Sequence, residues 1–148
     1  MIILRERPPM FDEIDSKFNI RGKPILFSWG DRIYIPSGNP EVPAHLMAHE
    51  RAHGARQLTF GGSGSIIAAA RIELWWRRYL EDTHFRLEEE IIAHQAEYHA
   101  LCRDRGGRLE RRRNLAITAA KLAAPLYGRL ISVKEAKKVL TDGYRESV

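Results

Sequence analysis

The stretch His49-Glu50-Arg51-Ala52-His53 has two histidines four residues apart, with a glutamate directly after the first. On an α-helix, residues four apart lie on one face, about one turn from each other. His49 and His53 can therefore offer two imidazole nitrogens to one ion. Glu50 is rotated by about 100° from His49. This rotation makes Glu50 unsuitable as a third ligand of the same ion but well placed to hold a metal-bound water.

This arrangement of side chains predicts a hydrolytic zinc site. Zinc binds imidazole well, and a catalytic zinc keeps one coordination position open for water. The metal lowers the pKa of that water, and a nearby carboxylate takes the proton as the water attacks a carbonyl. Glu50 is thus the predicted general base. The alternative is a pair of histidines on a buried or solvated helix face, with an unrelated glutamate between them.

The helix that carries this stretch is predicted to begin near Pro43, because proline suits the first turn of a helix. His45 lies one turn before His49 on the same face. We interpret His45 as a bystander and not a ligand, because the zinc-binding pattern is complete without it.

Two short strands are predicted before this helix, at 25–29 and 32–36, with a tight turn at Gly30-Asp31 between them. Pro36 cannot donate to a strand ladder, so we expect this end of the second strand to be an edge or a terminus of the sheet. An extended peptide could then add to Ile33, Tyr34 and Ile35 by backbone hydrogen bonds. The alternative is a purely structural hairpin. Residues 1–20 are expected to form an N-terminal arm that contains a short helix.

A long helix is predicted from about 84 to 104, with one stripe of core-facing residues. At 100° per residue, these residues share an arc about 100° wide; they are Leu87, Glu90, Ile91, His94, Tyr98 and Leu101. Glu88 and Glu89 point elsewhere and are expected to be solvated. An earlier helix, over 66–80, is expected to bury at least one of Trp75 and Trp76.

Glu90 is the predicted third metal ligand. A carboxylate in an apolar stripe is costly unless it is paired or bound to a metal, and two histidines need one more protein donor to complete a catalytic zinc site. The alternative for Glu90 is a buried ion pair, for example with Arg56. His94, one turn on, could orient a ligand or bind the transition state, or it could be an ordinary core histidine.

Six arginines lie within residues 103–113, and they could contact phosphate groups. There is no interleaving of aromatic residues, so an exposed, solvated helix junction is the favoured interpretation. Residues 114–148 are predicted to form C-terminal helices, the last of them opened by a capping box at Ser132–Glu135.

Length and composition indicate one domain, 1–148, because 148 residues with 44% hydrophobic and 29% charged content can bury a real core. The single cysteine, Cys102, excludes an internal disulfide and hence a secreted disulfide scaffold. No signal peptide or membrane-spanning stretch is recognised, so we expect a cytoplasmic protein without a membrane partner. The net charge of +5 is weak evidence for a nucleic-acid partner.

The residues 45–57, followed by Glu90-Ile91-Ile92-Ala93-His94, resemble the gluzincin metallopeptidases. The resemblance implies that His49, His53 and Glu90 bind the zinc and that Glu50 is the general base. It also implies that Ala93 permits close helix packing and that His94 stands where many relatives have aspartate.

The strand Ile33-Tyr34-Ile35 also looks like the substrate-side edge strand of the gluzincin fold. The segment 47–58 is similar to small zincin-like domains of bacterial and phage genomes, so the resemblance also raises the possibility of a phage- or prophage-encoded protein. The resemblance covers roughly residues 25–100.

The sequence therefore predicts an α+β, mostly α, minimal zincin-like fold, with a short hairpin before the metal-binding helix and a later helix that carries the third ligand. The predicted activity is hydrolysis of a peptide or protein substrate with one zinc ion as cofactor. Two alternatives stay open: a non-catalytic zinc-binding structural or assembly protein, and a nucleic-acid-binding domain that uses residues 103–113.

Overall fold

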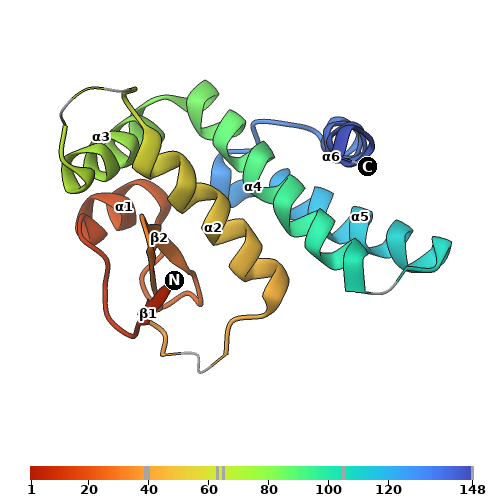
Figure 1. Ribbon diagram of the computed structural model, residues 1–148, viewed down its shortest axis with the longest axis horizontal. Helices are drawn as coiled ribbons and strands as arrows, with labels where there is room; N and C mark the ends of the chain where they lie inside the picture. Colours follow the sequence, from red (N-terminus) through yellow and green to blue (C-terminus); the bar gives the residue numbers. More distant parts are fainter. Residues whose placement is uncertain (39–40, 63, 65, 105, 148) are drawn as a thin grey trace. The chain divides into compact units, whose positions relative to one another are not determined.

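A computed structural model describes residues 1–38, 41–62, 64, 66–104 and 106–147, with the side chains of 104 and 144–147 left out. These residues form six α-helices, one short 3₁₀ helix and a three-stranded sheet (Figure 1). The elements in chain order are β1 (Ile2–Leu4), α1 (Phe11–Phe18), β2 (Phe27–Trp29), β3 (Arg32–Tyr34), α2 (Ala44–Thr59), α3 (Ala68–Glu81), α4 (Thr83–Asp104), α5 (Arg108–Leu122), η1 (Pro125–Tyr127) and α6 (Val133–Ser147). The predicted α+β, mostly α, class is confirmed.

The chain divides into two compact units. One contains Met1–Val42 and Glu50–Thr83, and the other contains Pro43–His49 and His84–Val148. Helix α2 contributes residues to both units. The prediction of a single domain stays a prediction.

The sheet of the first unit has the strand order β1-β3-β2. Strands β2 and β3 pair antiparallel, with Phe27 opposite Tyr34 and Trp29 opposite Arg32. Gly30 has a φ of +63° at the turn between them, a conformation that glycine adopts without steric cost. The predicted hairpin is confirmed, with strands two residues shorter than expected.

Strand β3 is the middle strand of this sheet and not an edge. It pairs with β2 on one side and parallel with β1 on the other, in the register Ile3 to Ile33. Beyond the strand, the backbone amide of Ile35 donates to the carbonyl of Leu4. The predicted edge position of Ile33, Tyr34 and Ile35 is therefore wrong, because the backbone groups of β3 already have partners on both sides.

The first 20 residues, expected as an arm, are built into the first unit. Residues 2–4 form β1, a strand too short to show an alternating hydrophobic pattern, and its parallel partner lies about 30 residues away in the sequence. The predicted short helix is confirmed as α1. It buries Phe11 and Ile14, and the Phe11 ring meets the Phe27 ring edge-on at 6.0 Å between centroids.

Helix α2 packs on the hairpin turn through Gly54 and Gln57. A Cβ atom added to Gly54 would lie 2.1 Å from the carbonyl oxygen of Gly30, so only glycine permits this approach. The Gln57 side chain is fully buried. Its amide oxygen accepts from the Gly30 backbone amide at 2.7 Å, and its amide nitrogen donates to the Ser28 carbonyl at 3.1 Å. These contacts fix the helix against the hairpin.

The second unit has its core between α4, α5 and α6. The buried members of this core are Tyr98, Ala119, Leu122, Ala136 and Leu140. Partly buried aliphatic side chains of α4, including Leu87 and Ile91, pack against them. Glu90 and His94 are also buried residues of α4.

Over the part of the chain that the structure describes, each helix is too short or too polar to span a lipid bilayer.

Candidate metal centre

Helix α2 begins directly after Pro43, as predicted, and runs without interruption through His49 and His53. Both histidines are buried, with 7% and 6% of their surface exposed. Because α2 is one continuous helix, the two imidazoles are one turn apart on the same face. Glu50 is also buried, and its position next to His49 turns it away from that line.

The His49 ring lies between two carboxylates of α4. Its Nε2 is 3.7 Å from Oε2 of Glu90, and its Nδ1 is 3.4 Å from Oε2 of Glu97. The ring of His94 meets it edge-on at 4.5 Å between centroids. Each nitrogen of His49 therefore faces a different acidic side chain, and both of those side chains are almost fully buried.

Glu90 and His94 lie on the buried side of α4, as their phase on the helix predicted. His94 Nδ1 is 2.9 Å from the Glu90 carbonyl oxygen and 3.3 Å from its Oε2. A carbonyl oxygen can only accept, so Nδ1 of His94 carries the hydrogen. The ligand role of Glu90 and the function of His94 stay predictions.

Glu97 is a member of this cluster that the sequence prediction missed. Its side chain is 1% exposed, and the ammonium group of Lys121 on α5 binds its Oε1. Burial raises the pKa of Glu97, but hydrogen bonds and charges of His49 and Lys121 lower it to about 2. The sequence carried the signal, because Glu97 follows Glu90 by seven residues and so lies within about 20° of it around the helix.

Helix α4 is buried around more of its circumference than one stripe. Glu88 is exposed, as expected, but Glu89 is buried at 1% exposure, so its predicted solvation is wrong. Arg86, one turn before Glu89, is also buried. The prediction failed because it assigned one core-facing stripe to a helix that buries a second face.

His53 lies in an aromatic cluster of the first unit. Its ring meets Trp75 at 5.4 Å and Tyr79 at 6.3 Å between centroids, both at steep interplanar angles. Trp75 stacks on Tyr79 at 4.9 Å, and Trp76 donates from its indole nitrogen to the Ser28 carbonyl. Both tryptophans of α3 are buried, which confirms the prediction that at least one belongs to the core.

His45 lies one turn before His49 and is half-buried. Burial lowers the pKa of His45, and the Lys121 charge adds to this effect, whereas the Glu97 carboxylate opposes it. None of the groups of possible ligand atoms among the described residues includes His45. Its interpretation as a bystander stays a prediction.

Buried side chains within the second unit could hold a metal ion. His49, His94 and Glu97 can each bring one ligand atom within 4.8 Å of the others, and His49 also faces Glu90. Imidazole nitrogen and carboxylate oxygen are the donors of catalytic zinc sites. A metal on Nε2 of His49 would be shared with Glu90, whereas a metal on Nδ1 would be shared with Glu97 and His94.

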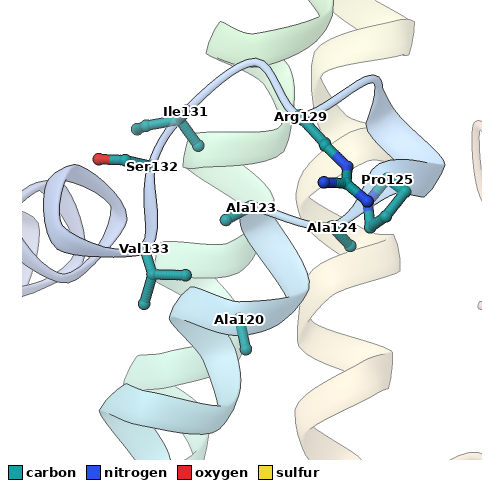
Figure 2. A pocket seen from close by; sticks show the side chains of 8 residues that line it. All are labelled: Ala120, Ala123, Ala124, Pro125, Arg129, Ile131, Ser132 and Val133. Atoms are coloured by element: carbon teal, nitrogen blue, oxygen red, sulfur yellow. The ribbon is translucent and has the colours of Figure 1, made fainter.

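An apolar surface hollow of about 570 Å³ lies elsewhere on the second unit, between the end of α5, η1 and the start of α6 (Figure 2). Its lining consists of Ala120, Ala123, Ala124, Pro125, Arg129, Ile131, Ser132 and Val133. Arg129 is the one ionisable group in this lining, and none of the residues of the His49 cluster belongs to it. The hollow is therefore separate from the His49 cluster.

The arginine-rich segment joins the end of α4 to α5. Arg103, Arg108, Arg111, Arg112 and Arg113 are exposed. Arg105 lies outside the described residues. Exposure agrees with a solvated junction and equally with a phosphate-binding surface, so both interpretations stay predictions.

No protein-family model, curated protein sequence or solved structure matches this chain. Its function is therefore inferred from the geometry and chemistry of its own side chains.

Proposed function

We propose that this chain is a zinc-dependent peptidase of the gluzincin type, with a minimal zincin-like fold. His49, His53 and Glu90 are the metal ligands and Glu50 is the general base. The substrate is a peptide or protein.

One observation carries this proposal: Nε2 of His49 faces Oε2 of Glu90 at 3.7 Å. His53 is one turn from His49 on the same helix face, so its imidazole is the second nitrogen donor of the proposed site. Glu90 is also the ligand predicted from its position in the apolar stripe of its helix and from the need for a third protein donor. Two histidines of α2 and one carboxylate of α4 make the ligand set of a catalytic zinc site with an open position.

The residues of the chain divide the chemistry between them. Zinc, when bound, supplies a Lewis acid that acidifies water and polarises the substrate carbonyl. Glu50 lies outside the line of His49 and His53, so its carboxylate can take the proton from the attacking water. It then passes the proton to the amine nitrogen that leaves as the peptide bond breaks. Because β3 lies inside its sheet, we do not assign the substrate to that strand.

The proposal is tested with Glu50→Gln, which keeps the size of the side chain but removes its basicity. We expect peptide hydrolysis to fall by about 10²- to 10⁴-fold, while bound zinc, measured by elemental mass spectrometry, stays unchanged. The matched control is Glu88→Gln, because Glu88 is an exposed glutamate of α4. Full activity in Glu50→Gln would contradict the mechanism.

The burial of the cluster favours a second candidate, a zinc-binding structural protein without turnover. Glu90, His94 and Glu97 are each at most 2% exposed, and extra protein donors near His49 could fill the position that water needs. This candidate expects zinc in the wild-type protein but no cleavage of any member of a peptide library. Measurable cleavage that Glu50→Gln abolishes would eliminate it.

A further inference from the structure

We propose that the junction of α4 and α5 binds the phosphate backbone of a double-stranded nucleic acid without reading its sequence. The exposed arginines that the structure describes at this junction form the arginine surface: Arg103, Arg108, Arg111, Arg112 and Arg113. None of these residues belongs to the His49 cluster. The inference is therefore a second function, separate from the proposed peptidase.

The arginine surface combines residues of two neighbouring helix ends (Figure 1). Arg103 is in the last turn of α4, and the other four are among the first six residues of α5. The side-chain amide of Asn114 in α5 donates to the Leu101 carbonyl of α4 at 3.5 Å, which holds the start of α5 beside the end of α4. The positive charge of both helices is therefore concentrated at one junction.

This charge is not neutralised by ion pairs within the described side chains. Among them, none of the five arginines lies within ion-pair distance of a carboxylate. The exposed arginines of α3 differ in this respect, because Arg77 pairs with Glu73 at 2.7 Å and Arg78 pairs with Asp82 at 3.5 Å. A concentrated and uncompensated positive charge attracts polyanions and raises the rate at which they associate.

The arginines at the start of α5 also oppose the helix dipole. The N-terminal end of a helix carries a partial positive charge, so cations are unfavourable there and anions are favourable. A phosphate bound at this end would be attracted by the dipole and by the guanidinium groups together. A sequence that breaks a local rule of helix stability commonly does so at a functional site.

The neighbouring apolar and aromatic residues favour a nucleic-acid duplex over a membrane or a single strand. Leu109 and Ile117 are 64% and 56% exposed, but Arg113 lies between them, four residues from each on the same side of α5. A helix that lies in a membrane interface needs a continuous apolar face. Residues 101–124 contain no aromatic residue, and aromatic rings are the groups on which the bases of single strands stack.

The first experiment measures the affinity of the wild-type protein for a fluorescently labelled DNA duplex by anisotropy, over a series of salt concentrations. Each neutralised phosphate contributes about −0.9 to the slope of log affinity against log salt, so five arginines give a slope of about −4.5. We expect the same affinity for a second duplex of unrelated sequence. Absence of binding at low salt would overturn the inference, and so would binding to phosphatidylserine vesicles but not to the duplex.

The second experiment repeats the salt series with the double variant Arg112→Gln/Arg113→Gln. We expect weaker binding to both duplexes and a slope that is less steep by about 2. The matched control is Arg77→Gln/Arg78→Gln, which removes the same charge from exposed arginines that have carboxylate partners. This control should keep the slope of the wild type.

Circular dichroism checks that both double variants keep the wild-type fold, as expected for exposed side chains. Equal losses of affinity in the two variants would show that binding follows net charge alone and would overturn the inference. An unchanged slope in Arg112→Gln/Arg113→Gln would also overturn it. Neither measurement needs zinc or hydrolysis, so failure of this inference leaves the proposed peptidase untouched, and failure of the peptidase leaves this inference untouched.

Discussion

The two histidines of α2 are one turn apart, and their rings have different aromatic and acidic neighbours. His53 is surrounded by the aromatic rings of Trp75 and Tyr79, whereas His49 is surrounded by Glu90, Glu97 and the His94 ring. The His53 ring thus contacts aromatic rings, and the His49 ring lies next to acidic side chains. Two histidines of one motif can therefore depend on different neighbouring side chains, so substitutions around each of them should have different effects on stability and on metal binding.

Breaking the aromatic environment is expected to have the largest effect on stability. Trp75 is 1% exposed and contacts His53, Trp76 and Tyr79. Trp75→Ala should lower the free energy of unfolding of the metal-free protein by about 3–5 kcal/mol, because it removes a large buried ring and leaves a cavity. Denaturant titration measures this loss. The neighbouring Leu74, 45% exposed, serves as the control, and Leu74→Ala should change stability by less than about 0.5 kcal/mol. Equal losses in the two variants would contradict the packing described for α3.

Replacing each histidine with phenylalanine sharpens the comparison directly. Both substitutions exchange an imidazole ring for a phenyl ring, so a difference in stability between the two variants reports the surroundings of each ring. His49→Phe leaves Glu90 and Glu97 facing an apolar ring, and a buried polar group that loses its partner costs about 1–3 kcal/mol. We expect the metal-free His49→Phe protein to be less stable than His53→Phe by about 2 kcal/mol. Both variants should lose zinc. Equal stability of the two would show that the carboxylates do not depend on His49.

Gly54, the residue after His53, lies where α2 packs closely against the hairpin turn at Gly30. Alanine normally stabilises a helix relative to glycine by about 1 kcal/mol. Gly54→Ala should instead destabilise the protein by about 1 kcal/mol or more, because the new Cβ would lie 2.1 Å from the Gly30 carbonyl oxygen. A gain of stability in thermal unfolding would mean that the hairpin does not approach the helix this closely.

A small effect is expected at a site outside both environments, the capping box at the start of α6. The Ser132 hydroxyl accepts from the Glu135 backbone amide and donates to the Glu135 carboxylate at 2.7 Å. These hydrogen bonds lower the pKa of Glu135. A carboxyl with a lowered folded-state pKa stabilises the protein above its unfolded pKa and stops doing so as the pH falls through its folded pKa. The melting temperature of Glu135→Gln should therefore fall less than that of the wild type between about pH 5 and about pH 3. Identical pH profiles would contradict this role of the cap.

The sequence predicted those features of the site that depend on helical phase alone. His49 and His53 share a face of α2, and Glu90 and His94 share the buried side of α4, because side-chain direction on a helix follows from residue spacing. Glu97 could have been predicted by the same rule, two turns after Glu90. It was missed because the assigned stripe was centred on the apolar residues around His94.

Features that depend on long-range packing could not be predicted in this way. The central position of β3 depends on a parallel partner at Ile2–Leu4, and three residues carry no pattern of alternation. The approach of Gly54 to Gly30 and the hydrogen bonds of Gln57 likewise join segments far apart in the sequence. Burial of Glu89 reflects a second packed face of α4, which hydrophobic periodicity does not show when the buried residue is itself charged.

The central claim is a zinc ion bound by His49, His53 and Glu90. It is tested most directly by the metal content of untagged protein, measured by elemental mass spectrometry for the wild type, Glu90→Ala and Glu88→Ala. We predict about one zinc per chain in the wild type and in Glu88→Ala, and a large loss in Glu90→Ala. Absence of bound metal in the wild type after zinc has been supplied would contradict the claim, and so would full zinc occupancy in Glu90→Ala.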